Sequence, residues 1–189
     1  ERKDPFFDKF LPIIKKMNTA MVSLEEGMGR TPHFNDAGNN VSKSAKQLSM
    51  FLKNRWNIIP KRKEEFPEAG YYKIHLPDGE LLFDCGPLGP DYMCGHAHCD
   101  ALSFELSVRN RPVFVNCGTY QYQGQKRSFF RSTKAHNTVV IDGKEQSELW
   151  GEHRAARRIH GLQCVYEENT VTGKYHTYSG NVHERTLDK

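Results

Sequence analysis

The chain has 189 residues, a length that fits about one to one and a half domains and can bury a sizeable core. Its net charge is +4 and its mean hydropathy is −0.72. No apolar run approaches the roughly 18 residues that a membrane helix needs, and no nucleic-acid-binding motif is present. Membrane-spanning and nucleic-acid-binding functions are therefore not expected, whereas the small basic groups fit either a solvated face or attraction to an acidic polysaccharide.

The first 60 residues carry two helical patterns. A stripe of apolar residues recurs at spacings of three and four: Phe6, Phe10, Ile13, Met17 and Met21. It predicts a helix that packs this stripe into a core, with Asp4 as its cap and Pro5 at its first position. A second helix is predicted from about Ser42 to Asn54, with a buried stripe formed by Ala45, Leu48, Phe51 and Leu52.

After the charged linker near residue 60, the hydrophobic period changes from about 3.6 to 2, which predicts strands. Residues 70–85 read as a hairpin around Pro77-Asp78-Gly79. Further strands are expected at 102–108 (half-buried), 113–115 (buried), 138–141, 161–167 and 170–178. Short turns between short strands favour antiparallel sheets. The predicted fold class is α+β, with a helical segment at 1–60 and an antiparallel β-sandwich domain at 66–189.

Three histidines and one asparagine lie at the ends of the predicted strands. His96 and His98 are two residues apart, so on a strand they would face one cavity. Asn116 and His136 each lie next to another predicted strand. Two histidines and an oxygen donor can form a zinc site with an open position, although paired surface histidines would look the same. Asp100 is either a further ligand or an acceptor that fixes a histidine tautomer.

Four blocks of sequence occur in an order that resembles the heparinase II/III-like polysaccharide lyases: Gly95–Leu106, Asn116–Tyr120, Arg131–Val139 and Ile141–Gln146. The resemblance covers roughly residues 28–160. It implies the end of an α/α toroid followed by an incomplete β-sandwich. It also implies that His98 and His136 are zinc ligands, and that Asn116 takes the place of a ligand that is usually aspartate. Weaker zinc binding is therefore expected.

The same resemblance implies β-elimination at a uronic acid within an acidic polysaccharide. His96 would face the substrate cleft, where it neutralises the uronate carboxylate or assists proton transfer. The candidates to line this cleft are Tyr120, Tyr122, Arg127 and Arg131. The family's other catalytic residues lie in the toroid, so this chain alone is expected to be inert. Relatives are usually exported, which implies a periplasmic or secreted location.

Two other functions remain open from the residues. One is a non-catalytic carbohydrate-binding or structural module, which Asn116 and the short helical segment favour. The other is a metal-dependent hydrolase, which would need a zinc-bound water and a nearby base, for which Glu105 and Asp100 are the candidates. The sequence does not distinguish heparin, heparan sulfate, alginate and bacterial exopolysaccharides as substrates.

Overall fold

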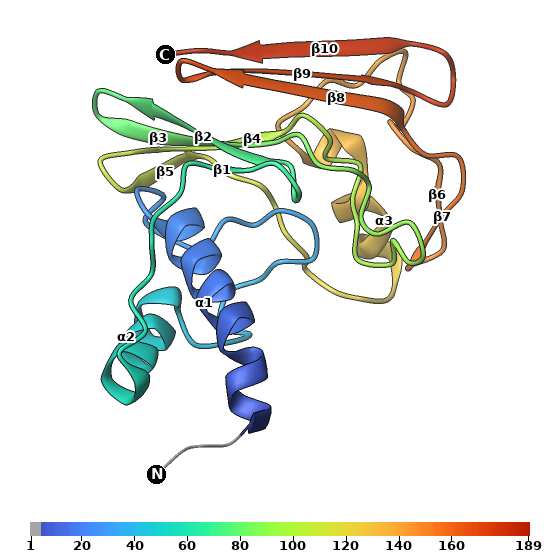
Figure 1. Cartoon of the computed structure of the whole chain (residues 1–189). Helices are drawn as coiled ribbons and strands as arrows, with labels where there is room; N and C mark the ends of the chain where they lie inside the picture. Colours follow the sequence, from blue (N-terminus) through green and yellow to red (C-terminus); the bar gives the residue numbers. More distant parts are fainter. Residues whose placement is uncertain (1–4) are drawn as a thin grey trace.

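A computed structural model describes residues 5–189, so the expected cap at Asp4 lies outside the described residues. Helices α1 (Pro5–Glu25) and α2 (Ala45–Trp56) lie on one side of a five-stranded sheet, and a three-stranded sheet lies on the other (Figure 1). The predicted α+β class, with helices first and antiparallel sheets after them, is confirmed. Within the described range no helix is long and apolar enough to cross a membrane.

The larger sheet is an antiparallel meander in the order β1-β2-β3-β4-β5. Its strands are β1 (Glu65–Phe66), β2 (Tyr71–Leu76), β3 (Gly79–Asp84), β4 (Phe104–Val108) and β5 (Arg111–Phe114). The smaller sheet has the order β10-β9-β8, from β8 (His160–Glu167), β9 (Thr170–His176) and β10 (Val182–Leu187). The remaining elements are α3 (Gln125–Arg131), a short 3-10 turn (Thr133–Ala135) and the hairpin β6 (Leu149–Trp150) and β7 (Arg154–Ala155).

The main hydrophobic core lies between the two sheets. Ile74 and Phe83 from the larger sheet meet Val171 and Tyr175 from the smaller one, and all four side chains are fully buried. The hairpin predicted at 70–85 is present as β2 and β3, which pair in register from Tyr71–Asp84 to Leu76–Gly79. The strands predicted near 161–167 and 170–178 are β8 and β9.

The opposite face of the larger sheet carries buried polar residues that bind the helical segment. The Lys73 ammonium donates hydrogen bonds to the carbonyls of Ser23 (3.0 Å) and Glu26 (2.9 Å) at the end of α1. A cation at this position complements the negative end of the helix dipole. The Glu105 carboxylate accepts from the Arg30 guanidinium (2.7 Å) and the His33 amide (2.7 Å). The end of α1 and the loop that follows it are therefore attached to the sheet by charge-assisted hydrogen bonds.

The predicted orientation of α1 is wrong. Its apolar stripe is largely exposed, with 69% exposure at Phe6 and 65% at Met17, whereas Asn18 and Ser23 are buried. The Ser23 hydroxyl accepts a hydrogen bond from the Lys63 backbone N–H in the segment before β1, and the Ser23 carbonyl accepts from Lys73 on β2. Phe51 of α2, also expected to be buried, is exposed. The spacing of apolar residues identified each helix but not the side that packs against the sheet.

Two strand predictions also need correction. Residues 113–115 were expected to be buried, but β5 is the edge of its sheet and Val113, Phe114 and Val115 are exposed. Residues 138–141 form no strand; an isolated bridge joins Ile141 to Lys144. In this region a side chain takes the place of strand-to-strand backbone hydrogen bonds. The side-chain amide of Asn137 donates to the carbonyls of Phe104 and Val115.

Replacing Lys73 with methionine tests the attachment of α1 to the sheet. We expect Lys73→Met to lower the free energy of unfolding by about 1–3 kcal/mol, because two buried carbonyls lose a charged donor. Lys174→Met is the matched control, since Lys174 lies on β9 and is partly exposed; its effect should stay within about 0.5 kcal/mol. Equal losses in urea unfolding of the two variants would contradict the assigned role of Lys73.

Candidate functional site

The segment Gly95–Asp100 is a loop rather than the expected strand, yet its two histidines share a partner. The backbone amide of His98 donates to the Asn35 side-chain oxygen (3.1 Å), and the Cys99 amide donates to the Arg131 carbonyl (2.9 Å). These bonds place the His98 ring inside the protein with 0% exposure, whereas the His96 ring is 72% exposed. The pair therefore has one buried ring and one ring that faces solvent.

Asp36 holds both rings. One of its oxygens lies 2.8 Å from His98 Nε2 and the other lies 2.8 Å from His96 Nδ1. The Arg127 guanidinium binds the same carboxylate in a bidentate manner, with Nη2 at 2.8 Å from Oδ2. Burial raises the pKa of Asp36, but the hydrogen bonds from His98, Arg127 and His96 outweigh it and hold this pKa well below its usual range. Asp36 is therefore a charged carboxylate that receives four hydrogen bonds.

Sequence reasoning did not single out Asp36. It lies in the loop between α1 and α2, about 60 residues before the histidines. Neighbouring Asn35 has a positive φ of 53°, a conformation that asparagine tolerates better than most residues, and its amide donates to Asp100 Oδ2 (3.2 Å). A polar Asn-Asp pair in a loop was the only signal available, and such pairs are common in turns.

Arg127 and Arg131, expected to line a substrate cleft, are buried. Arg127 donates from Nε to the Glu152 carbonyl (3.0 Å) and from Nη2 to the Gly95 carbonyl (3.2 Å). Arg131 donates from Nε to the Ala97 carbonyl (3.0 Å). Both guanidinium groups of α3 thus bind backbone carbonyls of the loop Gly95–Asp100, called the histidine loop below. Direct contact of either arginine with a substrate stays a prediction.

Tyr120 and Tyr122 are exposed and have different ring partners. The Tyr122 ring centroid is 5.8 Å from that of His96, and the His153 ring is 6.1 Å from His96. Tyr120 instead stacks on Phe130 at 5.7 Å. The structure therefore brings Tyr122 to the exposed histidine, together with His153, which the sequence did not suggest. Tyr120 lies against α3.

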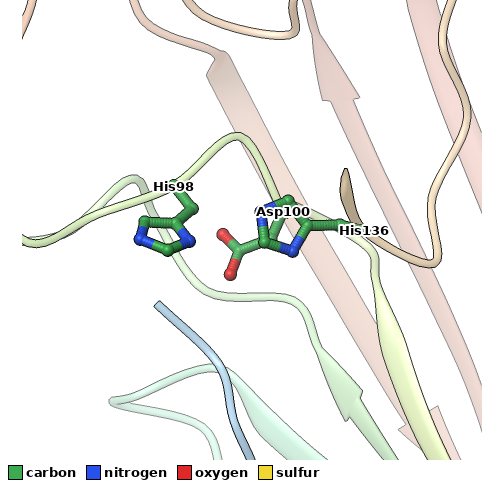
Figure 2. A group of neighbouring side chains, drawn as sticks. All are labelled: His98, Asp100 and His136. Atoms are coloured by element: carbon green, nitrogen blue, oxygen red, sulfur yellow. The ribbon is translucent and has the colours of Figure 1, made fainter. Parts of the chain in front are cut away.

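Three buried side chains next to the Asp36 network could hold a metal ion. The ligand atoms of His98, Asp100 and His136 all lie within 4.8 Å of one another, and Figure 2 shows the three side chains converging. One nitrogen of each imidazole is hydrogen-bonded to a residue outside the cluster. His98 Nε2 bonds to Asp36, and His136 Nδ1 bonds to the side-chain oxygen of Asn116. The other nitrogens, His98 Nδ1 and His136 Nε2, are buried without a hydrogen-bond partner. One oriented and one free nitrogen per ring is typical of metal-ligating histidines.

Burial determines the charge state of this cluster. Burial raises the pKa of Asp100 to about 6, although the neighbouring His98 acts to lower this pKa. Burial and the neighbouring His98 lower the pKa of His136 to about 3. His136 is therefore neutral at physiological pH, which is the form that binds metals.

Asn116, expected as a third ligand, contacts the cluster from its outer side. Its side-chain oxygen accepts from His136 Nδ1, and its amide nitrogen donates to Ser103 Oγ (3.3 Å). In this arrangement it orients the His136 ring. Coordination by Asn116 itself stays a prediction. Glu105, the base considered for a hydrolase, accepts from the backbone N–H of Asn116 (3.2 Å) as well as from Arg30 and the backbone N–H of His33, so its oxygens are occupied.

Neutralising Asp36 tests the hydrogen-bond network. We expect Asp36→Asn to lower the free energy of unfolding by about 3–5 kcal/mol at neutral pH, because Arg127 becomes a buried and unpaired charge. Because the pKa of Asp36 is lowered in the folded protein, its charge stabilises the fold at any pH above the ordinary pKa of aspartate. This stabilisation is lost as the pH falls towards the lowered pKa. The difference in the free energy of unfolding between wild type and variant, measured with urea, should therefore become smaller from pH 5 towards pH 3. A gap that widens with acidification would contradict the assigned charge state.

Comparisons with known proteins place the chain in a family. A family model described as Heparinase II/III-like, C-terminal, matches residues 58–188. No curated protein sequence matches the chain. A solved structure of a heparinase III gene product has a TM-score of 0.66 and 19% identity, covering 95% of this chain and 30% of that one.

Two further solved structures have the same fold. Heparinase III gives a TM-score of 0.62 at 18% identity, covering 95% of this chain and 32% of that one. The heparan sulfate lyase HepC from Pedobacter heparinus gives 0.60 at 17% identity, covering 95% and 30%. The chain thus spans less than a third of the length of these structures. Since the family match runs from the end of the helical segment through β10, the chain belongs to the heparinase II/III-like family, whose C-terminal part it contains.

Proposed function

We propose that this chain is part of a polysaccharide lyase that cleaves a uronic-acid-containing polysaccharide by β-elimination. The single observation that carries the proposal is the exposed His96 ring held on the buried, charged Asp36. Because Nδ1 of His96 is directed at Asp36, Nε2 is the nitrogen presented to solvent. Membership of the heparinase II/III-like family and the heparinase III fold support this reading.

The fixed orientation of His96 suits two roles in β-elimination. In the protonated form, Nε2–H donates to the uronate carboxylate and offsets the charge that develops when the C5 proton leaves. In the neutral form, Nε2 accepts a proton from the sugar, and the protonated ring formed in this way then returns a proton to the leaving oxygen. In either form, Asp36 fixes the tautomer and stabilises positive charge on the ring, as carboxylates do for catalytic histidines. Tyr122 lies beside this ring and is proposed to contact the same sugar.

The buried cluster is proposed as a zinc site with His98 Nδ1, His136 Nε2 and the Asp100 carboxylate as ligands. Two orphaned imidazole nitrogens and a carboxylate are a donor set that zinc accepts. A bound zinc would contribute a fixed positive charge and a cross-link between the histidine loop and the segment after α3. These three residues anchor the loop that carries His96. They are not proposed to touch the sugar.

The alternative is a non-catalytic carbohydrate-binding module of the same family. Asn116 favours it, because the neutral amide takes the place of a usual aspartate and contacts His136. The two functions differ in product. Unsaturated uronate ends formed by the longer protein would support the lyase, and glycan binding without such ends would support the module. A periplasmic or secreted location is proposed for either.

Metal content tests the proposed ligand set. We expect about one zinc per purified chain by elemental analysis, and its loss in His98→Ala. Asp100→Asn should weaken binding by more than the roughly 10–100-fold typical of an outer-shell change. Asn116→Asp distinguishes a zinc site whose oxygen ligand is Asp100 from one whose oxygen ligand is residue 116. A large gain in zinc affinity would identify residue 116 as a direct ligand. Equal zinc content in wild type and His98→Ala would exclude the cluster as the site.

Sugar binding tests His96. We expect His96→Ala to reduce the affinity for a heparan sulfate or alginate oligosaccharide by about tenfold, roughly one charge-assisted hydrogen bond. The melting temperature should fall only slightly, because the ring is mostly exposed and the hydrogen bonds from His98 and Arg127 to Asp36 remain. His160→Ala is the control, as His160 is an exposed histidine on β8. Unchanged affinity in calorimetric titration would remove His96 from the binding surface, and a folded chain with lost zinc would assign it to the metal site instead.

A further inference from the structure

Two cysteines, one next to each sheet's inner face, meet in the core of the sandwich. Cys85 directly follows β3 and is buried, and Cys164 lies on β8 with its side chain on the inward face of that strand. Cys85 belongs to the main core cluster, and Cys164 packs against it. All five cysteines of the chain are free thiols in the structure.

The side chains of Cys85 and Cys164 are hydrogen-bonded to each other. The Cys85 thiol donates to the carbonyl of Gln163, the residue before Cys164, at 3.5 Å. Gly173 pairs with Cys164 across β8 and β9, and a Cβ added at Gly173 would lie 2.8 Å from Cys85 Sγ. The Cys85 sulfur therefore occupies space that a side chain at 173 would fill, directly over the Cys164–Gly173 pair. A larger residue at 173 would separate the two thiols.

We infer that Cys85 and Cys164 form a reversible disulfide that joins the two sheets of the sandwich. The bond would close a loop from residue 85 to 164, and this loop contains His96, His98, Asp100 and His136. Oxidation would therefore constrain both ends of the segment that carries most of the candidate site. The pairing does not depend on lyase activity, so the failure of one proposal leaves the other intact.

The chemistry requires an external disulfide as oxidant, such as glutathione disulfide or a thiol oxidase. Cys164 is the attacking thiol because it is only half-buried, and hydrogen bonds from Cys85 and Tyr72 lower its pKa against the effect of burial. Its thiolate attacks the oxidant, forms a mixed disulfide and releases one thiolate. Cys85 then gives up its proton and attacks the Cys164 sulfur, which releases the second thiolate. Two electrons pass from the protein thiols to the oxidant, whose disulfide becomes two thiols.

The other three cysteines are not arranged for this reaction. Cys99 donates to the Ser147 carbonyl at 3.3 Å, and Cys117 donates to the Ala135 carbonyl at 3.1 Å. Cys94 lies in a separate small cluster with Leu88 and Ala97. The expected cross-link is therefore specific to one pair, although Cys117 is the exposed thiol.

The test is peptide mapping of the 189-residue chain after equilibration with glutathione disulfide. We expect a Cys85–Cys164 cross-linked peptide, a fall from five titratable thiols to three, and a melting temperature higher by roughly 5–15 °C that dithiothreitol reverses. Cys164→Ser should lose the cross-link and the shift, whereas Cys117→Ser should keep both.

The map of the wild-type chain decides the question even if Cys164→Ser folds poorly. Free thiols at both Cys85 and Cys164 in the oxidised, folded chain would overturn the inference. So would a stable glutathione adduct on Cys164 that Cys85 does not displace, or a cross-link from Cys164 to another cysteine.

Discussion

The carboxylate of Asp36 is the constraint around which the site is organised. A buried carboxylate costs several kcal/mol unless hydrogen bonds and opposite charge replace its water. Here Arg127 supplies the charge, and the rings of His96 and His98 supply further donors. Asp36 lies in a loop of the helical segment, and its partners come from the histidine loop and α3. Meeting the demands of one charge therefore brings three distant parts of the chain together.

The same hydrogen bonds give the two histidines different roles. Because Asp36 occupies Nδ1 of His96 and Nε2 of His98, the free nitrogen of each ring points in a different direction. That of His96 faces solvent, and that of His98 is buried beside Asp100 and His136. A surface histidine and an interior histidine thus arise from neighbours two residues apart. The hydrogen bond to Asp36 fixes the orientation of the exposed His96 ring.

The sequence predicted the features that local pattern encodes. The hairpin of β2 and β3 followed from a period of two and a Pro-Asp-Gly turn, and the order of four motif blocks identified the family. It missed what depends on contacts between distant residues. The exposed stripe of α1 looks like a core stripe because spacing does not tell which face is covered. Asp36 has no local pattern, and Arg127 looked like a surface cation because its partner lies 91 residues away.

The neutral Asn116 does not leave the buried cluster without charge, because Asp100 supplies a carboxylate next to the two free imidazole nitrogens. Asn116 instead accepts a hydrogen bond from His136 Nδ1, which directs Nε2 towards Asp100 and His98. An aspartate there would accept the same bond while adding a second buried negative charge close to Asp100. A second buried charge costs free energy unless a cation lies beside it, and the neutral amide avoids this cost. The amide thus keeps the orientation of His136 without adding a second buried negative charge beside Asp100.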